Sequence, residues 1–147
     1  MAESREYAGL TEEQVRAETE LMEGVPFLNI GAFLLPPIWG PAHGTWLTVL
    51  WYPVWLFADN LFYAAWSDPT AFNIVFAVLT FIVLLLATLL FARLMQPRAL
   101  HRALEERGKT KEQYLAAERR WAIACAIIAA GLIVAATYYN LAIRPAM

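Results

Sequence analysis

Asp59 is the residue in this sequence best able to carry chemistry, because it is an acid inside an apolar stretch bracketed by tryptophans. An ionisable group at membrane depth is costly unless it is paired, protonated or wet, which makes it a functional candidate. Polar side chains that could satisfy it lie beside it or in the last apolar stretch: Asn60, Tyr63, Asn140 and Arg144. The sequence leaves two interpretations open, a structural polar clamp and a proton, ion or ligand site.

The two histidines and the single cysteine add little further chemistry. His43 and His101 each lack a histidine or cysteine three or four residues away, so we expect no metal or haem site. We expect His43 to hydrogen-bond at the headgroup boundary and Cys125 to pack as a small apolar residue. The chain has no nucleophile–base pair, glycine-rich phosphate loop or metalloprotease motif, so we expect no catalysis of its own and no cofactor.

Small side chains recur along the last apolar stretch at spacings that allow two helices to approach closely. The residues concerned are Ala126, Ala130, Gly131 and Ala135. Two interpretations remain, packing against the other spans of the same chain and a contact face for a foreign subunit. We favour packing within the chain.

The composition indicates what kind of elements hold these residues. Of the 147 residues, 60% are hydrophobic and 16% are charged, against about 45–50% and 25% in soluble domains. So few charged residues cannot cover so much apolar surface in water, so the lipid bilayer is the expected partner. The net charge of −2 gives no basic excess that would indicate nucleic acid.

Three stretches predict transmembrane helices in an all-α integral membrane protein. Two nearly uncharged runs are each long enough to cross a hydrocarbon layer about 30 Å thick, and we place these spans at 71–93 and 121–143. The third stretch, at 46–66, is bracketed by tryptophans but contains Pro53, so we expect a kinked span there. The membrane domain thus covers residues 46–147.

Residues 25–45 are apolar but rich in proline and glycine, which excludes one straight helix. We expect at most a short helix over residues 27–35, with a break at the following proline pair. Irregular backbone at membrane depth must be covered by protein or water. The segment is therefore predicted to be re-entrant or interfacial, and the residues that define it are Pro36, Pro37, Trp39 and His43.

Eight of the eleven basic residues lie between Ala92 and Trp121. Loops this basic stay in the cytoplasm, so we predict that loop 94–120 is cytoplasmic and that the C-terminus lies outside. Within the loop we expect a short helix over 98–107 that ends at Gly108. A continuous helix should then run from Lys111 into the last span.

The N-terminal segment 1–24 is acidic and is predicted to be a cytoplasmic helix that begins with a capping box at Thr11. Its side of the membrane depends on segment 25–45, because a crossing there would move the N-terminus outside. We expect the acidic residues 12–23 to dock on the basic residues 98–120, by an attraction that salt weakens.

The stretch FLNIGAFLLPPIW, residues 27–39, is followed by a Gly-Thr-Trp step into an aromatic span. It resembles a pattern in small uncharacterised bacterial inner-membrane proteins, an N-A-F-x-x-P-x-W segment before short hydrophobic helices. The resemblance implies a bacterial inner-membrane location with the N-terminus inside, and it implies no activity.

Two classes of function remain open. The first is an accessory or scaffolding subunit of a membrane assembly, or a homo-oligomer, that has a protein partner or a second copy within the membrane. The alternative is a small transporter, channel or ligand-binding protein organised around Asp59 and the broken segment 32–43, since interrupted backbone near a buried acid is how carriers build sites.

Overall fold

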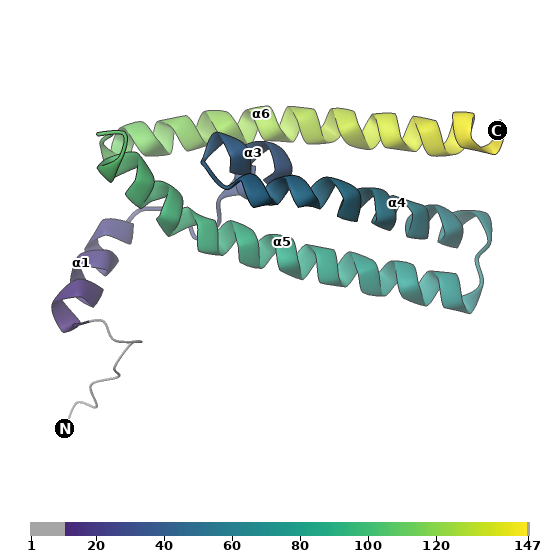
Figure 1. Ribbon diagram of the computed structural model, residues 1–147, viewed down its shortest axis with the longest axis horizontal. Coiled ribbons are helices and arrows are strands. Elements are labelled where there is room, and N and C mark those ends of the chain that lie inside the picture. Colours follow the sequence, from purple (N-terminus) through teal and green to yellow (C-terminus); the bar gives the residue numbers. More distant parts are fainter. Residues whose placement is uncertain (1–10, 147) are drawn as a thin grey trace, which may run out of the picture.

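The computed structural model describes residues 11–146, which form helices and no strand, so the predicted all-α class is confirmed. Three long helices run side by side, and the shorter N-terminal elements gather at one end of them (Figure 1). In chain order the elements are α1 (Glu12–Met22), α2 (Ile30–Leu34), α3 (Pro36–Ala42), the 3₁₀ turn η1 (Trp46–Leu50), α4 (Trp51–Ser67), α5 (Ala71–Glu105), α6 (Lys111–Tyr138), the π-helical turn η2 (Tyr139–Ile143) and the 3₁₀ turn η3 (Arg144–Ala146).

Two helical segments, α5 and the continuous stretch from α6 through η2, are long and apolar enough to cross a membrane. The second begins with a capping box in which Thr110 and Gln113 satisfy each other's backbone amides. It then runs to Ile143 as predicted. Large apolar side chains on both helices face outward, for example Phe81 at 57% exposure and Ile127 at 68%. Such surfaces suit lipid rather than water.

The end of α5 differs from the prediction. Instead of a span at 71–93 and a separate helix over 98–107, a single helix of 35 residues runs through Pro97. A proline inside a helix removes one backbone hydrogen bond, but Met95 and Gln96 before it and Ala99 after it are all buried. Packing on both sides of the proline keeps the helix continuous, while α5 changes direction toward its C-terminal end (Figure 1).

The third predicted span also begins differently. Residues 46–50 form the 3₁₀ turn η1, and α4 starts only at Trp51 and has 17 residues. Pro53 therefore falls in the first turn of α4, where no intrahelical partner exists for the missing amide, and the expected kink is absent. At 1.5 Å per residue α4 is about 25 Å long, shorter than the other two helices.

The proline-rich segment folds into two short helices, as the expected break at the proline pair requires. The chain turns at Leu35, with φ −140° and ψ 68°, and Pro36 and Pro37 then occupy the first turn of α3. Both ends of the segment lie beside the turn between α5 and α6: Lys111 donates to the Glu23 carbonyl, and Arg107 donates to the Ala42 carbonyl at 3.2 Å. The segment therefore does not pass to the other end of the long helices.

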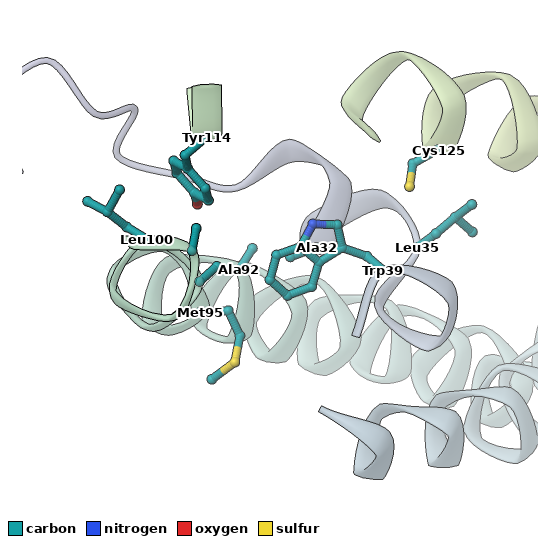
Figure 2. Close-up of a cluster of buried hydrophobic side chains, with 10 residues drawn as sticks. Ala32, Leu35, Trp39, Ala92, Met95, Leu100, Tyr114 and Cys125 are labelled. Atoms are coloured by element: carbon teal, nitrogen blue, oxygen red, sulfur yellow. The ribbon is translucent and has the colours of Figure 1, made fainter. Parts of the chain in front are cut away.

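The buried core lies where α2 and α3 meet α5 and α6 (Figure 2). Its largest member is Trp39, which is 1% exposed, and Leu35 and Leu100 are buried with it. The side chain of Thr48 crosses over Gly40, where an added Cβ would come within 2.0 Å of the threonine hydroxyl. A glycine is needed at that position for η1 to fold back onto α3.

Helix α1 starts at the predicted capping box of Thr11 and Gln14. It ends before Gly24, whose φ of +74° suits a helix terminus. The acidic helix lies against the end of α5, where the carboxylate of Glu18 is 2.7 Å from Nε2 of His101. This contact joins the acidic residues 12–23 to the basic residues 98–120, the two segments that we expected to dock.

Candidate functional site

Two clusters of polar side chains lie at opposite ends of α6. The Asp59 cluster consists of Asp59, Asn60, Tyr63, Asn140 and Arg144. The Glu118 cluster consists of Asn29, Trp39, His43 and Glu118. From Glu118 to Asn140 the chain advances 22 residues, which is roughly 30 Å along a helix.

In the Asp59 cluster, the acid of α4 meets the polar end of the last helical segment. Asn140 Nδ2 donates to Asp59 Oδ1 at 2.7 Å, and Arg144 Nη1 lies 3.8 Å from Asp59 Oδ2. The guanidinium also donates to Asn60 Oδ1 at 2.6 Å and lies 3.8 Å from the centre of the Tyr63 ring. The structure thus brings all four predicted residues together, with Arg144 as the cation among them.

This geometry favours the structural interpretation of Asp59. Its charge is matched by Arg144, and one of its oxygens accepts a hydrogen bond from Asn140. The contacts of this cluster join η2 and Arg144 to α4.

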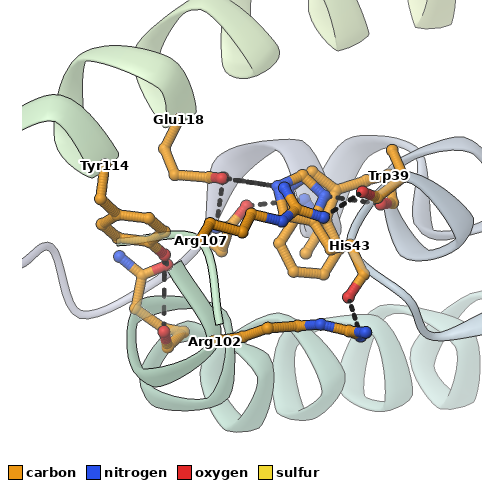
Figure 3. Close-up of polar contacts among 10 residues, drawn as sticks. Trp39, His43, Arg102, Arg107, Tyr114 and Glu118 are labelled. Atoms are coloured by element: carbon orange, nitrogen blue, oxygen red, sulfur yellow. Dashed lines mark hydrogen bonds and ion pairs between the residues drawn. The ribbon is translucent and has the colours of Figure 1, made fainter. Parts of the chain in front are cut away.

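The Glu118 cluster is more buried and joins more elements (Figure 3). Glu118 projects from α6 toward the proline-rich segment, and three donors converge on its carboxylate. Oε2 accepts from Asn29 Nδ2 at 2.7 Å and from Trp39 Nε1 at 3.0 Å, and Oε1 is 2.7 Å from His43 Nε2. The side chains of His43 and Glu118 are only 10% and 11% exposed.

Both ring nitrogens of His43 have partners within the chain. Its Nδ1 lies 2.8 Å from the Trp39 carbonyl oxygen, and its Nε2 faces the Glu118 carboxylate. The ring stacks on the Trp39 indole, with centroids 4.0 Å apart and planes 10° from parallel. These contacts fix the orientation of the imidazole ring between α3 and α6.

Glu118 is held in its ionised form. It precedes by three residues the apolar stretch that begins at Trp121, so it lies outside the predicted span. Burial raises the pKa of its carboxyl, but the hydrogen bonds from His43, Asn29 and Trp39 outweigh burial and keep that pKa below its usual value. Glu118 and His43 therefore form a buried, hydrogen-bonded pair.

Two arginines at the end of α5 complete this end of the molecule. Arg102 Nη1 donates to the His43 carbonyl at 2.9 Å, and Arg107 Nη2 donates to the Ala42 carbonyl. These are carbonyls at the end of α3, which no intrahelical donor satisfies. The basic residues of this region thus cap the proline-rich segment as well as facing solvent.

Sequence reasoning missed Glu118. It fell within a loop assigned to basic residues, and His43 was expected to bond at the headgroup boundary rather than to an acid 75 residues away. One local signal existed: Glu118 follows Tyr114 by four residues and precedes Trp121 by three, which puts it on the aromatic face of α6. Among the described residues, no three His, Cys, Asp or Glu side chains gather where a metal could bind.

The predicted helix-packing residues of α6 do not pack within the chain. Ala126, Ala130, Gly131 and Ala135 are all exposed, and an added Cβ at Gly131 would meet nothing within 4 Å. The exposure of these four residues gives no support to the favoured interpretation of packing against the other spans. In the structure α4 packs along α5, and α6 contacts mainly α2, with fewer contacts to α5 and α3.

The remaining predicted residues lie in the core. Pro36, Pro37 and Trp39 are buried, and His43 contributes to the Glu118 cluster. They are not near Asp59, which lies at the other end of the long helices.

No protein family, curated protein or solved structure matches the chain.

Proposed function

We propose that this chain is an accessory or scaffolding subunit of a membrane assembly, or a homo-oligomer, without catalysis of its own. The contact face is the stretch of α6 that carries Gly131 and its small neighbours. There another transmembrane helix, from a partner chain or from a second copy, packs closely against it.

The observation that carries this proposal is the environment of Gly131. Every residue from 130 to 139 is exposed, and an added Cβ at Gly131 would meet no atom of the described residues within 4 Å. A glycine inside a helix costs about 1 kcal/mol relative to alanine, and nothing nearby in the chain requires the missing side chain. A helix from outside the chain that packs closely at this point would explain why the position is glycine, because small residues allow two helix backbones to come near each other.

The topology that goes with this function has three spans. We propose that α4, extended by η1, crosses the bilayer together with α5 and α6. Its exposed terminal tryptophans, Trp46 and Trp66, suit the two interfaces. The end that holds α1 and the basic turn is cytoplasmic and the C-terminus lies outside, in the inner membrane of a bacterium.

A transporter organised around Asp59 and segment 32–43 has less support. The two features are at opposite ends of α6, so they do not form one site. Asp59 also has Arg144 as its counter-ion, whereas a proton or cation carrier needs an acid that exchanges its partner.

Crosslinking in native membranes tests the proposal. Cys125 is first replaced by alanine, and a cysteine is introduced by Gly131→Cys. Oxidation joins two copies through this cysteine, and a benzophenone maleimide attached to it captures a foreign chain that offers no cysteine. The matched control is Val83→Cys on α5, because Val83 is also exposed and lies near the middle of its own apolar run. Two cysteines are joined only when their Cβ atoms come within about 4.5 Å.

We expect oxidation or the benzophenone to give a crosslinked product with Gly131→Cys and none with Val83→Cys. The mass of that product identifies a second copy or a foreign chain. Absence of a product at Gly131, or equal products at both positions, contradicts the proposed contact face.

A further inference from the structure

The structure carries a cavity that neither the Asp59 cluster nor the contact face uses. It has a volume of about 30 Å³ and lies between the end of α3, the end of α5 and the beginning of α6. Its lining includes seven polar or aromatic residues: His43, Arg102, Arg107, Lys109, Tyr114, Glu118 and Trp121. Arg107 is exposed and Lys109 is half-buried, so the cavity reaches the surface between them.

Cations outnumber acids around this cavity. Arg102, Arg107 and Lys109 line it, and Glu106 pairs with Arg102 beside it. Glu118 is the acid in the lining, and its oxygens are already occupied by three donors from the protein. The field at the mouth of the cavity therefore attracts an anion.

Several donors at the mouth remain available. Arg102 uses Nε for Glu106 and Nη1 for the His43 carbonyl, and it has a second terminal nitrogen. The guanidinium of Arg107 makes one hydrogen bond, through Nη2. Lys109 forms no ion pair with any residue in the described range 11–146. Planar guanidinium groups beside an ammonium match the oxygens of a phosphate.

The depth of the site agrees with such a ligand. Glu118 precedes Trp121 by about one helical turn, Trp121 itself lines the cavity, and the uncharged stretch of α6 starts at that tryptophan. Tryptophan is enriched at membrane interfaces, at the level where lipid headgroups lie. A cavity of this volume holds about one water molecule, so the anion would sit at its mouth rather than inside.

We propose that this mouth binds a phosphate group, with Arg102, Arg107 and Lys109 as its ligands and the His43–Glu118 pair behind it. The phosphate belongs either to the headgroup of an anionic lipid or to a free phosphate anion. Both sources present the same oxygens to the same three cations.

The test uses the full-length protein in nanodiscs of phosphatidylcholine, with and without phosphatidylglycerol, and in a separate arm inorganic phosphate added to the phosphatidylcholine sample. Native mass spectrometry counts retained phosphatidylglycerol, and calorimetry measures phosphate binding. The variant Arg107→Gln/Lys109→Gln removes two of the ligands. Its matched control is Arg119→Gln/Arg120→Gln, which removes the same charge from exposed positions of α6 outside the cavity.

We expect the wild type and the control to bind the ligand alike, and Arg107→Gln/Lys109→Gln to bind it about tenfold or more weakly, as the loss of charge-assisted hydrogen bonds implies. Selective retention of phosphatidylglycerol identifies a lipid ligand, and saturable binding of inorganic phosphate identifies a free anion. Equal weakening in both double variants would overturn the proposal, since it would indicate general surface attraction. So would the absence of binding in both arms.

Discussion

The buried pair of His43 and Glu118 makes a prediction about what holds the proline-rich segment in place. The change is Glu118→Ala. It leaves the His43 ring, the Trp39 indole and the Asn29 amide without their partner. Because the two side chains of the pair are about nine-tenths buried, removing one partner should cost about 3–5 kcal/mol.

Cys125 offers a local readout of this loss. It is the single cysteine of the chain, it is fully buried, and it lies in the same core as Leu35 and Trp39. If α2 and α3 detach from α6, the thiol becomes accessible to a small uncharged maleimide. A loss of 3–5 kcal/mol corresponds to an increase in the open population of about 10² to 10³-fold or more, and the labelling rate in detergent micelles should rise accordingly.

The matched control is Asp59→Asn. This substitution alters the acid of the other polar cluster, at the opposite end of α6, where Asp59 accepts a hydrogen bond from Asn140 of η2. It should leave the labelling rate of Cys125 near that of the wild type. A Glu118→Ala protein that labels at the wild-type rate would refute the reasoning. Equal acceleration by both variants would also refute it, because the protein would then be opening as a whole.

Three further predictions concern other contacts. Arg144→Ala should lower the free energy of unfolding in detergent by about 1 kcal/mol, because the pair with Asp59 is partly exposed. Vesicles that contain the wild type or Arg144→Ala should show no proton flux, and a flux that Asp59→Asn abolishes would restore the transport alternative. Gly131→Leu should leave the monomer as stable as the wild type or more stable, since the position is open and leucine favours helix, while abolishing association; a destabilised monomer would contradict this. The hydrogen bond of Glu18 raises the pKa of His101, which lies nine residues beyond the apolar part of α5. The docking of α1 on α5 should therefore be complete below pH 6.5 and weaken as pH rises through the raised pKa. Fluorescence transfer between labels on α1 and α6 measures the docking, and the same pH dependence in His101→Gln would exclude this cause.

The features that could be predicted from sequence are those set by neighbouring residues. The capping boxes of Thr11 and Thr110 and the break at Pro36 depend on backbone chemistry within a few positions. The partners of Asp59 could also be anticipated, because few polar side chains exist in the apolar stretches that could meet it.

The features that sequence did not predict depend on which elements pack together. His43 meets Glu118 only because α3 folds back between α5 and α6. Helix α5 continues through Pro97 because residues on both sides of the proline are buried in the core. The small residues of α6 stay exposed because α4 packs on α5 instead. In each case the outcome follows from tertiary contacts that local spacing does not encode.

The central claim is that α6 is an association surface, and the mass of the particle released from native membranes by a mild detergent tests it most directly. Native mass spectrometry should give a particle heavier than one chain of 16.6 kDa, containing a second copy or one defined partner, and Gly131→Leu should reduce it to the single chain. A wild-type particle that consists of one chain alone would contradict the claim.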